Sequence, residues 1–316
     1  MKRLLFLSAL AFTACDFLPG GGGGTGGGSG GGGGSEFSKG FIFVRRDDRN
    51  LYAADERDFS SSKQLTTSGG ARSPSLSRDG KRVVFVRTVG AETEVATVAV
   101  TGGTVSTVIS SAAMGPRNAR TPVFTPDGTK IVFAFDEGGL SKVGIVDTDG
   151  TNFRTVSTST TLSYAGLSMY PDGSGVLAAA GSSTSMLTQV EKVSLSAGSG
   201  MNVVSSLGAE ADAITSRVVL SPDGTKAAFD ARLKGESAVR IFVLDLTTKA
   251  ITQLTDYPGD QNASDASPCW LGNDKVCFSS DTGGNDQVYA LPSTAMKTSG
   301  GLQLAGATEP WYGPNP

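Results

Sequence analysis

The sequence TPVFTPDGTKIVF occupies residues 121–133, and variants of it recur along the chain. Each copy holds an apolar segment, a turn centred on Asp-Gly or a related pair, and a second apolar segment. Proline suits the second position of a tight turn and glycine accepts a positive φ, so each copy predicts a β-hairpin. The further copies lie at residues 73–85, 166–178, 218–229 and 267–278. Their spacing of about 45–50 residues indicates a propeller or a solenoid.

Two more alternating segments follow the hairpins, as at residues 143–146 and 251–255. Four short antiparallel strands in each repeat form one propeller blade, and the sequence has no sustained helical periodicity. Residues 41–66 supply only the last three strands of a blade, and residues 308–315 align with the missing first strand. The sequence therefore predicts an all-β, six-bladed β-propeller of four-stranded antiparallel blades. The C-terminal strand is expected to pair with the strand from Phe41 and to close the ring.

Residues 1–14 have the features of a bacterial lipoprotein signal peptide, because two basic residues precede a short apolar stretch and a small residue precedes Cys15. The apolar stretch is too short to span a bilayer as a helix. We therefore predict lipidation of Cys15 and a disordered, Gly-rich linker over residues 15–38, ahead of a propeller at 39–316. The alternative is an ordinary secretory signal with an incidental cysteine. Under either interpretation the protein is exported.

The repeat resembles that of TolB-like propellers, which are related to WD-repeat propellers. The family pattern combines the hairpin motif with a later Asp-x-Asp-Gly turn and a Leu-Thr pair. It is found here at residues 121–133, 147–152, 64–66 and 253–255. The resemblance covers most of the chain after the Gly-rich segment and implies the fold, but it leaves the function open.

The namesake of this family is a periplasmic partner-binding protein with an additional N-terminal α/β domain, whose place the Gly-rich segment takes here. Its partner and its role are therefore not carried over. Related propellers also cap serine peptidases of the prolyl-oligopeptidase type, which need an α/β-hydrolase domain. The sequence shows no such domain after the repeats, so a peptidase is not expected.

The amino-acid composition excludes several kinds of catalytic and metal site. The chain contains no histidine, which excludes a Ser-His-Asp triad, a Cys-His dyad and a histidine-ligated metal site within it. The net charge of -3 and the lack of a long basic run give no indication of nucleic-acid binding. Residues 147–152 read DTDGTN, but Thr158 occupies the place of the distal glutamate that a calcium loop needs. We interpret this segment as a hairpin turn and predict no metal and no cofactor.

Cys269 and Cys277 lie on the two strands of the hairpin at residues 267–278. If its turn centres near Asn273, the two residues face each other across the strands. A cross-strand disulfide would fit an oxidising compartment, and the alternative is a pair of reduced thiols buried in the core.

Arg72 and Arg120 occupy equivalent places, two residues before the proline of a first strand. This place is expected near the mouth of the central channel, where two cations could bind a carboxylate or a phosphate. The alternative is a solvated rim, or ion pairs with acidic residues such as Asp265 and Glu309 of neighbouring blades. These four residues form the predicted ligand face.

These features favour a membrane-tethered, non-enzymatic envelope lipoprotein. It is expected to be a monomer in the periplasm or at the cell surface, whose propeller face binds another protein or an envelope polymer. The alternative is a small-ligand or carbohydrate-active propeller that uses carboxylates at the central channel, and a third reading is a purely structural envelope component. An enzyme of this kind needs two converging carboxylates, whereas a docking face would show aromatic residues and arginine.

Overall fold

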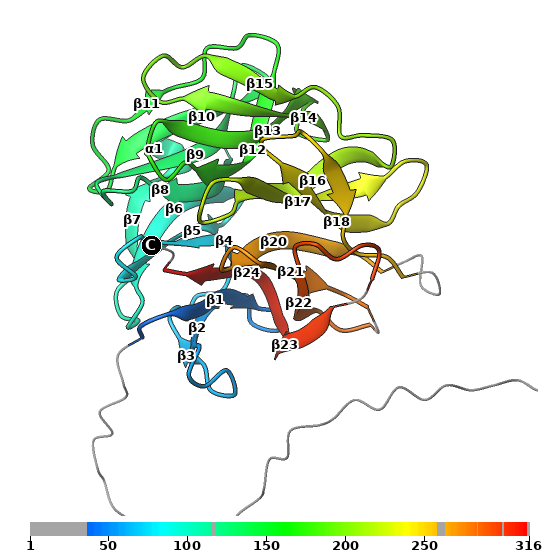
Figure 1. Cartoon of the computed structure of the whole chain (residues 1–316). Helices are drawn as coiled ribbons and strands as arrows, with labels where there is room; N and C mark the ends of the chain where they lie inside the picture. Colours follow the sequence, from blue (N-terminus) through cyan, green and yellow to red (C-terminus); the bar gives the residue numbers. More distant parts are fainter. Residues whose placement is uncertain (1–36, 115–117, 258–262, 283, 299, 315–316) are drawn as a thin grey trace, which may run out of the picture. The chain divides into compact units, whose positions relative to one another are not determined.

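The computed structural model describes residues 37–114, 118–257, 263–282, 284–298 and 300–314 (Figure 1). The predictions for the signal peptide, for Cys15 and for residues 15–36 of the linker lie outside these ranges. The described residues form 24 β-strands and one short helix, α1 (Ser111–Met114). Within them, no helix is long and apolar enough to cross a membrane. The prediction of an all-β protein is therefore confirmed.

The described strands form five sheets, four of which have four strands (Figure 1). One contains β24 (Ala307–Gly313), β1 (Gly40–Arg45), β2 (Leu51–Asp55) and β3 (Lys63–Gln64). The next contains β4 (Ala71–Leu76), β5 (Arg82–Val89), β6 (Glu92–Ala99) and β7 (Ser106–Ile109). A third contains β8 (Ala119–Phe124), β9 (Lys130–Glu137), β10 (Leu140–Asp147) and β11 (Arg154–Thr155). A fourth contains β20 (Asp265–Leu271), β21 (Lys275–Ser280), β22 (Gln287–Pro292) and β23 (Gly301–Ala305).

The fifth sheet has eight strands in two groups. The first group is β12 (Ser163–Met169), β13 (Gly175–Ser183), β14 (Met186–Ser194) and β15 (Gly200–Val204). The second group is β16 (Ala211–Leu220), β17 (Lys226–Leu233), β18 (Val239–Asp245) and β19 (Ile251–Gln253). Between β14 and β16 a single residue pair, Leu187 with Ile214, joins the groups. Five sheets therefore stand where the sequence predicts six separate blades, because this one pair merges two four-stranded groups.

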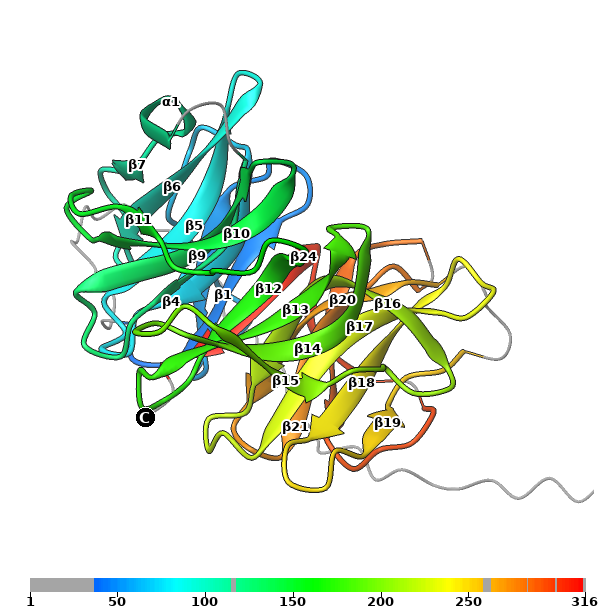
Figure 2. The same ribbon diagram turned by 90° about the horizontal axis from the view of Figure 1, so that it is seen from above.

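The first strands of the repeats lie toward the middle of the molecule, and last strands such as β3, β7 and β11 lie toward its outside (Figure 1). In order, β4, β8, β12, β16, β20 and β24 each contact the next, and β24 contacts β4. The first strands thus form a closed cycle. Figure 2 shows the same antiparallel sheets from above.

The C-terminal strand completes the sheet of the N-terminal strands. β24 pairs with β1, and Tyr312 lies opposite Phe41 and Trp311 opposite Ile42. This pairing confirms the prediction that the chain's last strand lies beside the strand from Phe41. Because the two strands come from opposite ends of the described chain, their hydrogen bonds close the cycle of sheets.

The hydrophobic core lies mainly between adjacent sheets. One buried cluster joins β1 and β2 to β4, β5 and β6, and another joins β5 and β6 to β8 and β9. The phenylalanine that ends four of the five hairpin motifs belongs to this core and is at most 1% exposed. Four copies show it: Phe85, Phe133, Phe229 and Phe278. Burial of such a side chain stabilises the fold by roughly 1.5–3 kcal/mol, so the motif carries its own packing residue.

The aspartates of the repeat are turn residues. In three hairpins a Ser or Thr hydroxyl donates to the Asp carboxylate at 2.6 Å, and a backbone amide two positions later donates to the same carboxylate at 3.0–3.1 Å. The hydroxyl pairs are Ser77–Asp79, Thr125–Asp127 and Ser221–Asp223. The glycine after each aspartate has a φ of 68–71°, which a residue with a side chain rarely adopts.

Candidate functional site

The cycle of first strands encloses a central axis, which we call the channel. Each first strand carries a β-bulge along it. The pairing of every first strand with its neighbour shifts register at this point, and φ is positive, between 43° and 62°, at five equivalent positions. Alignment of the repeats defines one bulge position per copy: Ser73, Thr121, Gly166, Arg217, Ser267 and Glu309. A bulge frees backbone groups from the ladder and redirects side chains, which here places them along the channel.

Neighbouring first strands satisfy the amides that the bulges free. The amide of Ser73 donates to Oε2 of Glu309 at 2.5 Å, and the amide of Ser267 donates to Oγ of Ser216 at 3.1 Å. The amide of Leu167 donates to Oγ1 of Thr121 at 3.3 Å. The channel wall is therefore tied together from strand to strand and forms a fixed surface for a ligand.

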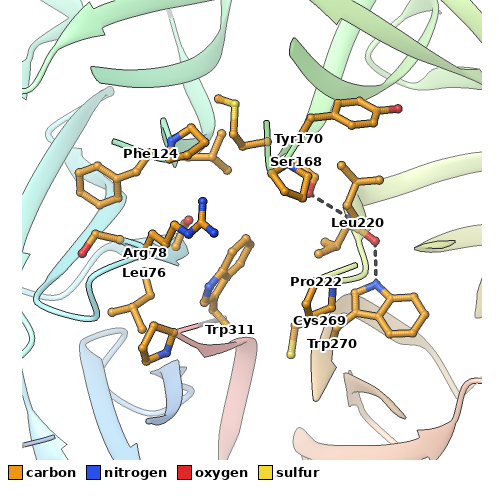
Figure 3. A pocket seen from close by; sticks show the side chains of 18 of the residues that line it. Leu76, Arg78, Phe124, Ser168, Tyr170, Leu220, Pro222, Cys269, Trp270 and Trp311 are labelled. Carbon is orange, nitrogen blue, oxygen red and sulfur yellow. Dashed lines mark hydrogen bonds between the residues drawn. The ribbon is translucent and has the colours of Figure 1, made fainter. Parts of the chain in front are cut away.

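One end of the channel, at the hairpin turns, is an apolar cavity of about 140 Å³ that we call the turn-side mouth (Figure 3). Its described lining includes Leu76, Arg78, Phe124, Tyr170, Leu220, Trp270, Trp311 and the prolines at positions 126, 171, 222 and 314. The side chains of Arg78 and Trp311 extend into the space between the strands (Figure 3). Among the described lining residues there is no Asp or Glu.

The wall of the turn-side mouth is held by hydrogen bonds behind the apolar surface. Nε1 of the buried Trp270 donates to the carbonyl oxygen of Val219 at 2.8 Å. The amide of Leu220 donates to Oγ of Ser168 at 3.0 Å (Figure 3). Both bonds join residues of different repeats, so they hold Trp270 and the backbone at Leu220 in place in the wall.

The opposite end of the channel is a cavity of about 300 Å³ that we call the strand-start cavity. Arg72 and Arg120 both line it, so the structure brings this predicted pair together. Arg72 is exposed and has no ionic or hydrogen-bonded partner among the described residues. Nη2 of Arg120 donates to Oδ2 of Asp136 at 2.9 Å, and Asn118 donates to the same oxygen at 3.1 Å. Burial acts to raise the pKa of Asp136, but these hydrogen bonds outweigh it and lower the pKa.

Glu309 and Asp265 do not pair with these arginines, contrary to the alternative considered from the sequence. Arg120 pairs with Asp136 instead, because Arg120 lies opposite Ala134 in the ladder and Asp136 is two residues further along the same face. The carboxylate of Glu309 accepts the amide of Ser73 and contacts Arg49 at 3.5 Å.

Asp265 is buried in the structure, whereas the sequence predicts that it lies on the ligand face. Its side chain is fully buried, close to the hydroxyls of Ser280, Thr255 and Tyr257. Burial raises the pKa of Asp265 to about 6, although the nearby Ser280 hydroxyl and the Arg240 charge act against it. An approaching ligand therefore cannot reach this carboxylate from the surface.

Cys269 and Cys277 lie directly opposite each other on β20 and β21, as the sequence predicts. Both thiols are buried and free in the structure. Contact with Cys269, followed by burial, raises the pKa of the Cys277 thiol. The oxidation of this pair to a disulfide stays a prediction.

Arg217 is the channel residue that sequence reasoning missed. It occupies the bulge position of β16 and is only 6% exposed. It lines a small inner cavity together with Ser73, Thr121 and Trp311. The signal that could have found it is the alignment of the repeats, because Arg217 is the cation among bulge residues that are otherwise small, neutral or acidic.

No family model and no curated protein matches the chain. Among solved structures, TolB from Acinetobacter baumannii is similar over 87% of this chain and 66% of its own, with 17% identity and a TM-score of 0.65. A putative TolB from Agrobacterium tumefaciens is similar over 87% and 92% of the two chains, with 15% identity and a TM-score of 0.58. An oligogalacturonate lyase from Vibrio parahaemolyticus is similar over 79% and 76%, with 15% identity and a TM-score of 0.52.

This chain spans just under two-thirds of the length of the Acinetobacter TolB. Likeness at such identities concerns the fold, and one fold serves both binding proteins and enzymes. The antiparallel sheets, the cycle of first strands and the two TolB structures agree with one another. The described residues between 37 and 314 therefore adopt a TolB-like β-propeller fold.

Proposed function

We propose that this protein is a non-enzymatic binding protein of the bacterial cell envelope, whose turn-side mouth holds a segment of a partner protein. The observation that carries the proposal is the lining of this mouth, which combines Trp311, Tyr170 and Phe124 with the exposed cation Arg78. Aromatic residues and arginine are enriched where proteins bind one another, and a fixed apolar cavity limits the entropy lost on binding.

The alternative of a carbohydrate-active propeller has less support. Such an enzyme would place two carboxylates about 5–10 Å apart at the channel. The described residues that line the turn-side mouth, the strand-start cavity and the inner cavity include no Asp or Glu. Asp230 and Glu309 lie beside the channel, but each carboxylate accepts hydrogen bonds from the strands themselves. These contacts favour structural roles for both.

A six-bladed ring is part of the proposal. The eight-stranded sheet counts as two blades, because Leu187 and Ile214 are the single pair that joins its halves. The cycle of first strands from β4 to β24 supports the same count, with one first strand for each blade.

The location in the envelope rests on the N-terminal sequence. We infer that residues 1–14 are removed, that Cys15 carries lipid and that residues 15–38 connect this anchor to the propeller. The protein would then act as a monomer in the periplasm or at the cell surface. Mass spectrometry of the mature N-terminus tests this part: a lipidated Cys15 supports it, and an unmodified terminus contradicts it.

Affinity capture from intact envelopes tests the binding function. The full-length protein, the mouth variants Arg78→Glu and Tyr170→Ala, and the outer-surface control Arg154→Glu are compared, after a check that their urea midpoints agree. A protein partner retained by the control and lost from both mouth variants supports the proposal. Equal capture by all four proteins, or capture of an envelope polymer in place of a protein, contradicts it.

A further inference from the structure

The guanidinium of Arg217 is buried without a full set of partners. The side chain is 6% exposed, and its Nη2 has no hydrogen-bond partner among the described residues. Burial lowers the pKa of Arg217, although charges nearby, including Glu309 and Asp230, act in the opposite direction. A buried cationic donor without an acceptor is costly and rare, so its presence calls for an acceptor supplied from outside the chain.

Asp230 and Glu309 are the two acidic residues near Arg217, but their carboxylates accept hydrogen bonds from other groups. Asp230 accepts hydrogen bonds from the hydroxyls of Thr215 and Ser216 at 2.5 and 2.7 Å and from the backbone amide of Arg217 at 3.1 Å. Glu309 accepts the amide of Ser73 and contacts Arg49. Neither carboxylate hydrogen-bonds to the guanidinium of Arg217.

Space for an acceptor exists beside Arg217. The inner cavity that Arg217 lines measures about 10 Å³, which is close to the room that one water-sized group needs. Ser73 and Thr121 line both this cavity and the strand-start cavity of about 300 Å³. The larger cavity is also lined by the unpaired Arg72, so the two cavities share part of their wall and a cation lines each of them.

The size of the two cavities and the guanidinium of Arg217 favour a carboxylate as the bound group. A guanidinium is a planar fork of donors that matches the two oxygens of a carboxylate. The inner cavity has room for about one oxygen-sized group, so one carboxylate oxygen fits there, and the strand-start cavity has room for the remainder of a small ligand. We propose that Arg217 binds the carboxylate of a ligand that enters the channel through the strand-start cavity, past Arg72 and Arg120.

This site differs from the turn-side mouth of the proposed function, because Arg217 lines the inner cavity among the bulges and is not one of the residues that line the mouth, although the two cavities share Ser75, Val123 and Trp311. The carboxylate could belong to a free organic acid or to the C-terminus of a peptide. Trp311 lines both the inner cavity and the turn-side mouth and is one of the two tryptophans of the chain, so its fluorescence reports binding at either place, and the Arg217 variants assign the signal.

The test measures tryptophan fluorescence of the full-length protein at constant ionic strength. The probes are succinate with its neutral diamide, and triglycine with its C-terminal amide. We expect saturable binding of at least one carboxylate and no binding of either amide analogue. Binding of succinate assigns the site to free acids, and binding of triglycine alone assigns it to peptide C-termini.

Three variants decide the role of Arg217. Arg217→Met should weaken carboxylate binding about 10-fold to 100-fold, which is the loss expected for a charge-assisted hydrogen bond, while Arg154→Met should leave it unchanged. Arg217→Lys keeps the charge without the fork and should bind weakly, and it serves the same purpose if Arg217→Met fails to fold. Because a buried cation gives way to an apolar side chain, the urea midpoint of Arg217→Met should match or exceed that of the parent.

Two results would overturn the proposal. One is the absence of saturable binding by any carboxylate, which would mean that water alone satisfies Arg217. The other is unchanged affinity in Arg217→Lys and Arg217→Met. Neither result bears on the turn-side mouth, because the mouth variants are measured separately.

Discussion

The backbone amide of Ser73 donates a hydrogen bond to Oε2 of Glu309 at 2.5 Å, across 236 positions of the chain. Ser73 lies in β4 and Glu309 lies in β24, so this bond joins the last strand to the sheet that follows the N-terminal strands. It stands beside the pairing of β24 with β1 as a second link between the two ends of the described chain.

Loss of this bond should weaken the closed cycle. Glu309→Ala leaves the Ser73 amide without an acceptor, and we expect the free energy of unfolding to fall by about 1–3 kcal/mol. Urea unfolding followed by circular dichroism measures the change. The control Glu236→Ala, in an exposed turn, should shift the midpoint little, and equal midpoints for both variants would contradict the closing role of Glu309.

Gly166 is predicted to tolerate no side chain. Its φ is +62°, and a Cβ atom there would lie 2.6 Å from Cα of Arg217 and 3.0 Å from the carbonyl oxygen of Ser216. Gly166→Ala therefore forces β12 and β16 apart and should destabilise the protein by more than about 1 kcal/mol. Gly235 is the matched control, because its φ is +76° but a Cβ atom meets nothing within 4 Å. A thermal melt should show a clearly larger loss for Gly166→Ala than for Gly235→Ala. Equal losses would mean that the close approach of the strands is unimportant.

Asp265 should make stability depend on pH. Burial raises its pKa from the ordinary 3.8 to about 6, so between these values the folded state binds more protons than the unfolded state. The contribution of this group to stability therefore increases as the pH falls from about 6 toward 4. Asp265→Asn removes the titration. The stability of the variant relative to the parent should be greater at pH 7.5 than at pH 5.0, by about 1 kcal/mol. Urea unfolding at both pH values measures this difference, and a constant difference would show that the carboxyl titrates normally.

The repeat motif was sufficient to predict the hairpins and the closing strand, because their determinants are local. The buried phenylalanine recurs in four of the five hairpin copies and the Asp-Gly turn also in four, and the C-terminal segment aligns with a first strand. The pairing of Leu187 with Ile214 could not be predicted from the repeat motif. It depends on how closely the edges of β14 and β16 approach, which no short motif specifies.

The site was predicted less completely for a related reason. The position of Arg72 and Arg120 at the channel follows from the repeat alignment, and the structure places both in one cavity. The burial of Asp265 and of Arg217 depends on side chains from several strands, so neither could be inferred from its own segment. The ion-pair partner of Arg120 could not be predicted for the same reason, since the register of β8 and β9 places Asp136 beside Arg120.

The most direct test of the binding function is photo-crosslinking in intact cells of the native host. A photoreactive phenylalanine analogue replaces Met169 at the turn-side mouth or Glu236 in the exposed turn between β17 and β18. The proposed function predicts one discrete protein adduct from position 169 and none from position 236. No adduct from position 169, or the same adducts from both positions, would contradict the claim that the turn-side mouth holds a partner segment.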